Sequence, residues 1–405
     1  MKIAFVDNLS VGGGLSRFSL KLCTSLIEYD KHLEVDYYIH ELNLLQIPEI
    51  RSLSSRVSVK VLNSTKKRSK LTAFLNHRIN RILKIKLYTQ DTIKEIEKRV
   101  GMDYDLAYFP CAHMMKMPVL KIPVSGTWHD FNWRYFFGVE IFSNEFTGMM
   151  DAETSKWFSG AHCITSSHYI AEEGKRMYPG MPRYPEVIPI AQVVVSEKMA
   201  QQEADEIVKK LGIHYPYLIF PGNFIPHKNH LNLFTAFYLL KRNPAFKDHK
   251  LILTGMGTDK VEKAKSGYYG IRKVLNDSKD FDIVGMGYQP NKYIDALIMN
   301  ADLLVSPSLY EAICTPGMDA WSFGTPTAVS DIPPFREHES TWNIRSAFFD
   351  PMDPQNIADV IVAYLSDPAK AKQDAAISRE RLAAYNWQII AKNYMAVFQK
   401  AIDRT

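Results

Sequence analysis

The chain has 405 residues, of which 46% are hydrophobic and 23% are charged, and its formal net charge is +5 at pH 7. This composition is globular and excludes a disordered chain, and the length suits two domains of about 200 residues each. The modest charge does not by itself indicate a polyanionic partner. No segment approaches 18 uninterrupted apolar residues, so we expect a cytoplasmic protein that at most rests on a membrane surface.

The first half of the sequence alternates short apolar runs with longer stretches of helical periodicity. Residues 3–6 predict a strand, glycines follow at 12–14, and residues 15–27 repeat apolar positions at helical spacing. Further strands are predicted at residues 35–39, 106–109, 124–127 and 163–165. This alternation favours a parallel sheet that is covered by helices on both faces.

The same pattern begins again after residue 195. A helix-like stretch at 196–211 precedes predicted strands at 217–220, 251–253, 281–284 and 303–305. We therefore predict two doubly wound α/β domains, residues 1–195 and residues 196–385. Residues 386–405 form a last segment, and we expect its amphipathic helix at 387–402 to pack back toward the first domain.

The cysteines predict neither a metal site nor disulfide bonds. No CxxC motif or pair of histidines at metal-ligand spacing accompanies them. They are widely separated, at Cys23, Cys111, Cys163 and Cys314. We expect reduced thiols, and Cys314 is expected to be a packing residue rather than a nucleophile.

Unusual residues follow the predicted strands, and ligands bind at the carboxyl ends of strands in sheets of this kind. The glycines at 12–14, His129, residues 223–229 and the stretch from Glu311 to Asp319 all lie at such ends. The economical interpretation is a cleft between two facing domains, lined from both sides.

The stretch from Glu311 to Asp319 combines a helix start with two carboxylates. Thr315 suits a helix N-cap and Pro316 suits the first helical position, so we expect free amides there that attract a phosphate. Gly317 would let the phosphate approach the backbone. A carboxylate has two acceptor oxygens and suits the paired hydroxyls of a sugar. Phosphate and hydroxyls together indicate a nucleotide sugar.

These residues carry a family resemblance. The spacing Glu311-x7-Asp319, followed by Gly324-Thr325-Pro326, resembles the Glu-x7-Glu motif of the retaining glycosyltransferases of family 4, which have the GT-B fold of two Rossmann-like doubly wound domains. The ordered flanks resemble other motifs of that family: Gly222-Asn223 through His227-Lys228-Asn229 its phosphate-binding strand end, Trp128-His129-Asp130 its histidine motif, and Gly12 to Gly14 its glycine loop.

The resemblance implies how a donor diphosphate would be held. Lys228 would neutralise the departing diphosphate, and the amides of Gly13, Gly14 and Gly317 would share its charge. Further donor-binding positions implied by the motifs are Gly222, Asn223 and Thr315.

The resemblance also implies the chemistry. Glu311 would hold hydroxyls of the donor sugar, Asp319 the ribose hydroxyls, and His129 would reach the transferred sugar. No metal or other cofactor would be needed. The acceptor hydroxyl, on a glycan or lipid-linked acceptor in surface polysaccharide or lipopolysaccharide synthesis, would attack from the leaving-group face, so that the anomeric configuration is retained.

Three departures keep a second interpretation open. Asp319 replaces the second Glu of the motif, Asn223 stands where an Arg often accompanies the lysine, and residues 312–314 are Ala-Ile-Cys rather than Gly-Phe-Gly. A catalytically silent GT-B protein that binds a nucleotide sugar or glycan and assists a partner transferase is the alternative. A nicotinamide-dependent oxidoreductase is a distant third. Taken singly, His129 could be a core histidine and Glu311 a solvated loop acid.

Residues 66–86 are basic, and apolar residues recur among the charges at near-helical spacing. Two interpretations are open: a surface helix that packs one face on its domain, or an amphipathic helix that lies on an anionic membrane near a lipid-linked acceptor. A nucleic-acid partner is not expected, because no binding module accompanies the charge.

Overall fold

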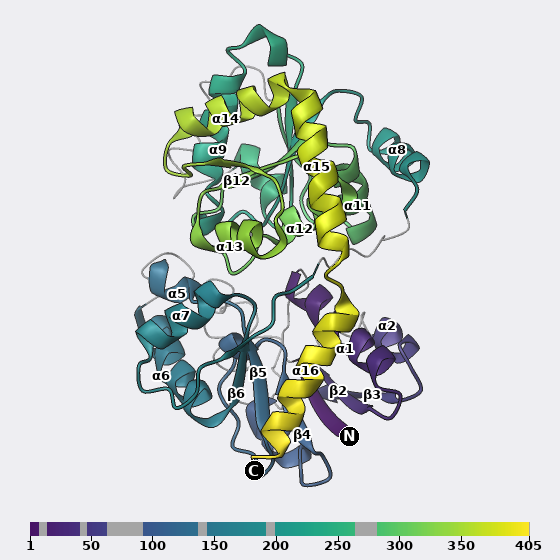
Figure 1. The fold of residues 1–405 in the computed structure, drawn as a ribbon, viewed down its shortest axis with the longest axis vertical. Coiled ribbons are helices and arrows are strands. Elements are labelled where there is room, and N and C mark those ends of the chain that lie inside the picture. Colours follow the sequence, from purple (N-terminus) through teal and green to yellow (C-terminus); the bar gives the residue numbers. More distant parts are fainter. Residues whose placement is uncertain are drawn as a thin grey trace, which may run out of the picture. The chain divides into compact units, whose positions relative to one another are not determined.

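The computed structural model describes residues 1–7, 14–40, 47–62, 92–136, 144–191, 199–263 and 282–404. The chain forms two compact units (Figure 1). Unit 1 comprises Met1–Ile190 and Trp387–Thr405, and unit 2 comprises Ala191–Asn386. The basic segment 66–86 and Gly13 lie outside the described residues. None of the helices in the described ranges is long and apolar enough to cross a membrane.

The described strands of unit 1 form a seven-stranded parallel sheet in the order β3-β2-β1-β4-β5-β6-β7. The strands are β1 (Lys2–Asp7), β2 (Glu34–His40), β3 (Val57–Leu62), β4 (Leu106–Phe109), β5 (Val124–Trp128), β6 (His162–Thr165) and β7 (Glu186–Val187). The helices include α1 (Gly14–Tyr29), α2 (Ile47–Ser52), η2 (Ala112–Met114), α5 (Asn132–Tyr135), α6 (Asn144–Gly160), α7 (His168–Met177) and α16 (Trp387–Ile402). The strand order reverses between β1 and β4, so the topological switch point lies there.

Alternate residues of β4 pack on opposite faces of this sheet, because successive strand side chains point to opposite sides. Tyr108 packs against Tyr394 of α16, with ring centroids 5.8 Å apart, and both hydroxyls hydrogen-bond to Thr127 Oγ1, at 2.6 and 3.0 Å. Phe109 packs against Trp157 of α6 at 5.2 Å. Helix α16 also packs against α1 (Figure 1). The last helix of the chain is thus part of the core of unit 1.

The described strands of unit 2 form a six-stranded parallel sheet in the order β10-β9-β8-β11-β12-β13. The strands are β8 (Tyr217–Pro221), β9 (Lys250–Thr254), β10 (Ile283–Gly285), β11 (Leu303–Ser306), β12 (Thr327–Ser330) and β13 (Ala347–Phe349). The helices include α8 (Gln201–Lys210), η3 (Pro226–Lys228), α9 (His230–Leu240), η4 (Pro244–Phe246), η5 (Thr258–Lys263), α11 (Asn291–Met299), α12 (Thr315–Phe323), α13 (Pro333–Trp342), α14 (Pro354–Ser366) and α15 (Pro368–Ala383). Here the order reverses between β8 and β11.

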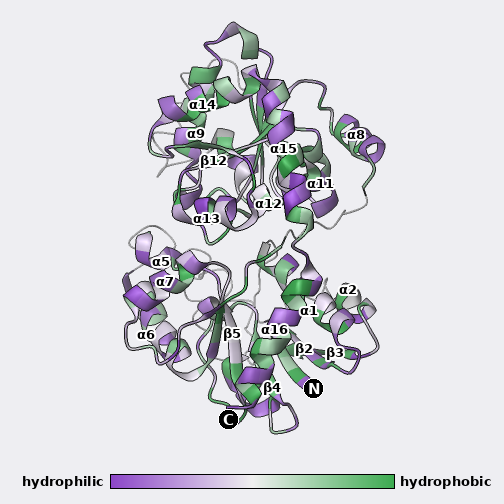
Figure 2. Cartoon of the chain, in the orientation of Figure 1, coloured by the Kyte–Doolittle hydropathy of each residue, from purple (hydrophilic) through white to green (hydrophobic). Residues whose placement is uncertain are grey.

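Strand β8 shows how unit 2 builds a core on each face of its sheet. Leu218 and Phe220 pack among apolar residues of α9 and α14, whereas Tyr217 and Ile219 pack among those of α8 and α11. Figure 1 shows these helix pairs on opposite sides of the strands, and Figure 2 shows apolar strands between helices that carry polar outer faces. The predicted α/β class with two doubly wound parallel sheets is confirmed.

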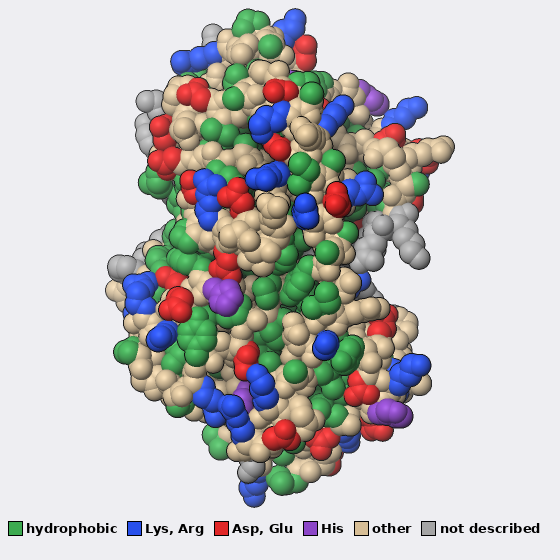
Figure 3. Space-filling view, in the orientation of Figure 1, with side chains coloured by type: hydrophobic (Ala, Val, Ile, Leu, Met, Phe, Trp, Pro, Cys, Tyr) green, Lys and Arg blue, Asp and Glu red, His purple; other side chains and the backbone are tan. Residues whose placement is uncertain are grey.

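Charged side chains of both signs are interspersed over the visible surface (Figure 3). This distribution agrees with the modest net charge of the sequence. The four cysteines are buried as free thiols inside the units.

The loops after β8 and β9 approach each other closely at Gly255. This residue has φ of +123°, and a Cβ there would lie 2.6 Å from the carbonyl oxygen of Gly222. Only glycine tolerates this combination of positive φ and close backbone contact.

Gly255→Ala is therefore expected to lower the free energy of unfolding of unit 2 by about 1 to 3 kcal/mol. Urea unfolding followed by tryptophan fluorescence measures the change. The control is Gly148→Ala in α6, where an added Cβ meets nothing within 4 Å, and where helix propensity predicts no loss of stability. An unchanged midpoint for Gly255→Ala would contradict the close approach.

Candidate functional site

The loops that follow β8 and β11 meet at the switch point of unit 2. Lys228 ends the short helix η3 after β8, and Glu311 lies in the loop after β11. The ammonium group of Lys228 donates a hydrogen bond to Glu311 Oε1, and each side chain is only 16% exposed. The fold thus brings together two of the predicted catalytic residues, which are 83 positions apart in sequence.

Asn229 fixes the backbone on which the lysine stands. It adopts a left-handed conformation with φ of 56° at the start of α9, which Asn tolerates better than most residues. Its side-chain amide donates to the carbonyl groups of Pro307, at 3.0 Å, and Pro351, at 2.7 Å. The Leu309 N–H donates to the His227 carbonyl at 2.8 Å. The loops after β8 and β11 are therefore joined on both sides of Lys228.

Gly222 and Asn223 connect the loop after β8 to the loop after β9. The Gly222 N–H donates to the Thr254 carbonyl at 2.8 Å, and Asn223 Oδ1 accepts from the Met256 N–H at 2.9 Å. The oxygen of Asn223 thus holds the neighbouring loop in place. Its NH2 group is the part of the side chain with donors to offer a ligand.

Helix α12 begins at Thr315, but Cys314 rather than Thr315 is its N-cap. Thr315 occupies the first helical position, and Pro316, at the second, has no N–H. The Cys314 N–H donates to His338 Nε2 at 3.0 Å, and the Met318 N–H makes the first intrahelical bond, at 2.8 Å to the Cys314 carbonyl. The predicted N-cap was therefore one residue too late. The Thr315 N–H remains in the first turn for an anion, whereas the Gly317 N–H donates to the Cys314 sulfur.

Cys314 is a packing residue beneath this helix start. Its side chain is buried, and burial raises the pKa of the thiol to about 12, so the sulfur is a neutral thiol at physiological pH. A Cβ at position 317 would lie 2.6 Å from this sulfur. Gly317 is thus required for the packing of Cys314, in addition to the approach of a ligand that the sequence predicted.

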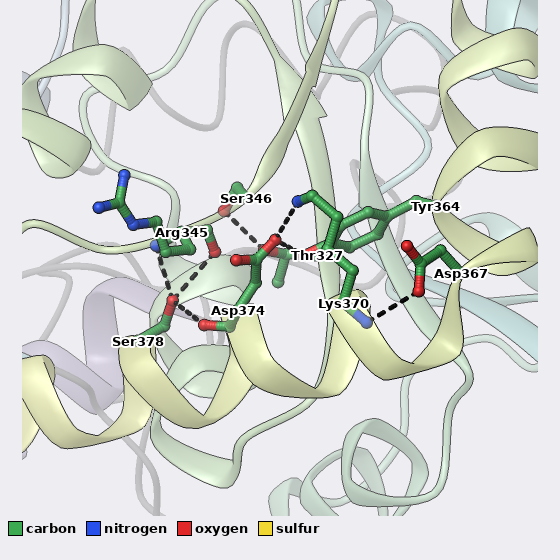
Figure 4. Close-up of polar contacts among 8 residues, drawn as sticks. All are labelled: Thr327, Arg345, Ser346, Tyr364, Asp367, Lys370, Asp374 and Ser378. Carbon is green, nitrogen blue, oxygen red and sulfur yellow. Dashed lines mark hydrogen bonds and ion pairs between the residues drawn. The ribbon is translucent and has the colours of Figure 1, made fainter.

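A polar network on the far side of α12 holds the helix in position. Trp321 Nε1 donates to the hydroxyls of Thr327, at 2.8 Å, and Ser346, at 3.1 Å. Figure 4 shows how the network continues to α15: Ser378 accepts from the Arg345 N–H at 2.7 Å and donates to the Arg345 carbonyl at 2.9 Å. The two strands β12 and β13 and the helix α15 therefore fix the direction in which α12 points.

Asp319 lies at the fifth position of α12, in its second turn rather than its first. The residue is 2% exposed. Its contact with a ribose stays a prediction.

His129 follows β5 and lies at the switch point of unit 1. Its Nε2 donates to the Pro110 carbonyl, after β4, at 2.8 Å. Its ring meets Phe18 of α1 at 5.0 Å and His113 at 5.3 Å, edge to face in both cases. Burial and the neighbouring His113 lower the pKa of His129 to about 3. The ring is therefore neutral at physiological pH.

The predicted glycine loop is described in part. Gly14 is the first residue of α1, which agrees with a loop that leads from β1 into a helix N-terminus. Gly13 falls among the residues that the structure does not describe.

Two residues that position the site were not predicted to do so. Asn229 belongs to a motif noted in the sequence, and an Asn directly before a helical run is a signal for a capping or left-handed residue. His338 has no such signal, because its contact with Cys314 joins α13 to α12 across 24 positions.

Comparison with known proteins identifies the segment that carries this site. Residues 203–383 match the family of glycosyl transferases group 1. The matched segment, which is less than half of the chain, contains both Lys228 and Glu311. A stretch of 110 residues is 28% identical to the MMP alpha-(1->4)-mannosyltransferase of Mycolicibacterium hassiacum, and it spans 27% of this chain and 27% of that enzyme.

Solved structures of the GT-B fold resemble the whole chain. Alr3699/HepE of Anabaena, in complex with UDP and glucose, has a TM-score of 0.70 at 14% identity and covers 99% of this chain and 100% of its own. WaaG, a glycosyltransferase involved in lipopolysaccharide biosynthesis, has a TM-score of 0.68 at 13% identity and covers 98% of this chain and 99% of its own. At these identities the likeness shows the fold, and the chain has the GT-B fold.

Asn229→Asp keeps a side chain that tolerates a left-handed backbone but places carboxylate oxygens against two carbonyl oxygens. We expect it to lower the free energy of unfolding of unit 2 by about 1 to 3 kcal/mol, measured by urea unfolding. Asn343→Asp is a matched control, because Asn343 is also left-handed, with φ of 51°, and is exposed. Equal effects of the two substitutions would contradict the role given to the Asn229 amide.

His129 is expected to resist protonation in mild acid. Its folded pKa lies below the ordinary value of 6.5, so between about pH 6.5 and 3 the unfolded chain binds a proton that the folded chain does not. Its contribution therefore lowers stability as the pH falls below 6.5, by up to about 1.4 kcal/mol per pH unit.

Imidazole NMR signals measure the protonation of His129 directly. The signal of His129 is assigned by its absence in His129→Gln. The ring should remain neutral with its proton on Nε2 at pH 5. A titration midpoint near pH 6 would contradict the burial described here.

Proposed function

We propose that the protein is a retaining glycosyltransferase that moves a sugar from a nucleoside-diphosphate sugar to a hydroxyl group of a glycan or lipid-linked acceptor. The acceptor class is that of surface polysaccharide or lipopolysaccharide synthesis, on the cytoplasmic side of a membrane. The observation that carries the proposal is the ion pair of Lys228 and Glu311 at the switch point of unit 2. It lies in the segment that matches the family of glycosyl transferases group 1.

The donor diphosphate would lie between Lys228 and the start of α12. The ammonium group supplies a full positive charge, and the Thr315 amide supplies a donor at the positive end of the helix. These groups stabilise the negative charge that develops on the departing phosphate. In this scheme no metal ion is required.

The sugar and the ribose would contact carboxylates. Glu311 has two acceptor oxygens, of which one takes the Lys228 ammonium, so the carboxylate can accept a sugar hydroxyl while it holds the lysine. Asp319 is proposed to contact the ribose, directly or through water.

The transfer breaks the bond between the anomeric carbon and the phosphate oxygen and forms a bond to the acceptor oxygen. The proton of the acceptor hydroxyl passes to the departing phosphate oxygen, on the same face of the sugar, and the configuration is retained. His129 would line the site of the transferred sugar. Because its ring is neutral, it would add no positive charge beside an electron-poor anomeric carbon.

Relatives support the classes of donor and acceptor. Alr3699/HepE was crystallised with UDP and glucose and also with UDP-glucose, and WaaG acts in lipopolysaccharide biosynthesis. The relative from Mycolicibacterium hassiacum is a mannosyltransferase. We therefore place UDP-sugars first among the donors to be tested.

A second candidate function is a silent protein that binds a nucleotide sugar and assists a partner transferase. The contact that favours it is that of Asn223 Oδ1 with the Met256 N–H. Asn223 thus uses its side chain to hold a neighbouring loop, at a position where enzymes with this motif often have an Arg beside the lysine.

The experiment is a panel of UDP-, GDP-, ADP- and TDP-sugars, in the presence of EDTA and candidate acceptors, with release of nucleoside diphosphate as the readout. Release with one donor supports a metal-independent transferase. A thermal shift without release, after acceptors have been screened, supports the silent binding protein. No response to any donor contradicts both candidates.

Lys228→Ala and Glu311→Gln should each lower kcat by about 100- to 1,000-fold, because each removes a group that stabilises the transition state. The matched control is the pair of Lys241 and Asp282, also in unit 2, with a distance of 2.7 Å and side chains 19% and 23% exposed. Lys241→Ala and Asp282→Asn remove an ion pair of similar burial and should leave kcat unchanged.

Retained transfer in Lys228→Ala and Glu311→Gln, with the fold intact by circular dichroism, would contradict the site. An equal loss in the control variants would show that the effect reflects stability rather than chemistry.

A further inference from the structure

Unit 1 contains a cavity of about 610 Å³ at the amino ends of β5 and β6. Val124 begins β5 and His162 begins β6, and both line the cavity. His129 follows the carboxyl end of β5. The cavity therefore lies at the edge of the sheet opposite to the proposed sugar site.

One wall of the cavity is apolar. The segment that leads into β5 provides it, with Met117, Pro118, Val119, Leu120 and Ile122 among the lining residues. Val119 is 85% exposed, so this wall is accessible to a ligand from solvent.

The other wall is basic. Arg183, from the loop before β7, and Arg404, which follows α16, line the cavity together with His162. Burial and the positive charges of the two arginines lower the pKa of His162. Both guanidinium groups are thus close enough to repel a proton on this ring.

Neither guanidinium has a carboxylate partner among the ion pairs of the described residues. The Nε of Arg183 is buried and has no hydrogen-bond partner there, and its Nη2 reaches the Ala161 carbonyl only at 3.5 Å. Glu186 is an acid whose charge acts on His162, and its carboxylate is paired with Lys400 at 2.8 Å. The basic wall therefore carries positive charge that this part of the chain does not neutralise.

Lys156 adds to the rim of the cavity, although it pairs with Glu153 at 2.8 Å. Guanidinium groups bind phosphate oxygens through paired N–H donors. A phosphate monoester carries close to two negative charges at pH 7, which matches two unpaired arginines. An apolar wall beside them suits an apolar substituent on the ester.

We propose that this cavity binds a phosphate monoester that carries an apolar substituent. Arg183 and Arg404 hold the phosphate, and the segment 117–122 contacts the substituent. The site is independent of the donor site proposed above, which lies in unit 2. The ligand has two possible sources, a free alkyl or aryl phosphate and the headgroup of an anionic lipid.

The test uses the full chain and n-hexyl phosphate as the probe, with hexanol and inorganic phosphate as partial probes. Isothermal titration calorimetry measures affinity, and the NMR signals of the His162 ring report the place of binding. We expect n-hexyl phosphate to bind more tightly than either partial probe and to shift His162. Absence of binding, or equal binding of hexanol, would overturn the proposal.

Arg183→Gln and Arg404→Gln should each weaken the binding of n-hexyl phosphate about tenfold, as expected for the loss of one charge-assisted contact. Arg51→Gln is the matched control, because it makes the same change of charge at an exposed position on α2 of the same unit. Equal weakening in the control would show attraction by net charge alone and would overturn the site.

Two further arms separate the sources and the sites. Vesicles of phosphatidylcholine with phosphatidic acid, compared with vesicles of phosphatidylcholine alone, test a lipid source. If Arg183→Gln loses vesicle binding, the ligand is a lipid headgroup. If the protein binds n-hexyl phosphate but not the vesicles, the ligand is a free ester. UDP should not compete with n-hexyl phosphate. Competition by UDP would assign the anion to the donor site and overturn this proposal, whereas failure of UDP-sugar turnover would leave it intact.

Discussion

The ion pair between Lys228 and Glu311 joins the two halves of the unit 2 sheet at the point where the strand order reverses. Both side chains are largely buried, so each charge loses much of its hydration, and a pair of this kind contributes little net stability. The ion pair matters through its position at the switch point of unit 2. The amide of Asn229 fixes the backbone beside the lysine, and α12 is fixed by Trp321 and the network behind it. The positions of Lys228 and Glu311 are thus supported by hydrogen bonds of neighbouring residues as well as by their own ion pair.

This arrangement has a consequence for ligand binding. Without a ligand the lysine is neutralised by Glu311. A diphosphate would compete for the ammonium group, and the carboxylate could then turn toward sugar hydroxyls. The Thr315 amide would provide further positive potential, so the site would recognise an anion and a polyol together, which is the composition of a nucleotide sugar. In unit 1 the neutral His129 is held by a backbone carbonyl, a contact that keeps the ring orientation independent of pH in the physiological range.

Much of the fold could be predicted from the sequence because its parallel strands are short apolar runs that end in polar residues. The order of element types sufficed for two doubly wound sheets, and β4 was predicted with its observed bounds. Strands β3, β7, β12 and β13 were missed: β7 contains only two residues, β12 begins and ends with hydroxyl residues, and β3 carries Ser58 and Lys60 among its apolar residues. The family motifs implied that Lys228 and Glu311 hold one donor, but their contact with each other was not predicted. The contact between Cys314 and His338 depends on how α13 packs, and no local sequence pattern encodes that packing. The N-cap is Cys314 rather than the predicted Thr315.

The central claim is that a nucleoside diphosphate binds at the switch point of unit 2, and methionine methyl NMR tests it most directly. Met318 lies in the first turns of α12 and Met256 donates its N–H to Asn223, whereas Met102 is 72% exposed in unit 1. With ¹³C-methyl methionine and UDP titrated into the full chain, the account predicts saturable shifts of Met256 and Met318 and none of Met102, and loss of these shifts in Lys228→Ala. Shifts confined to other methionines, or unchanged shifts in that variant, would contradict it.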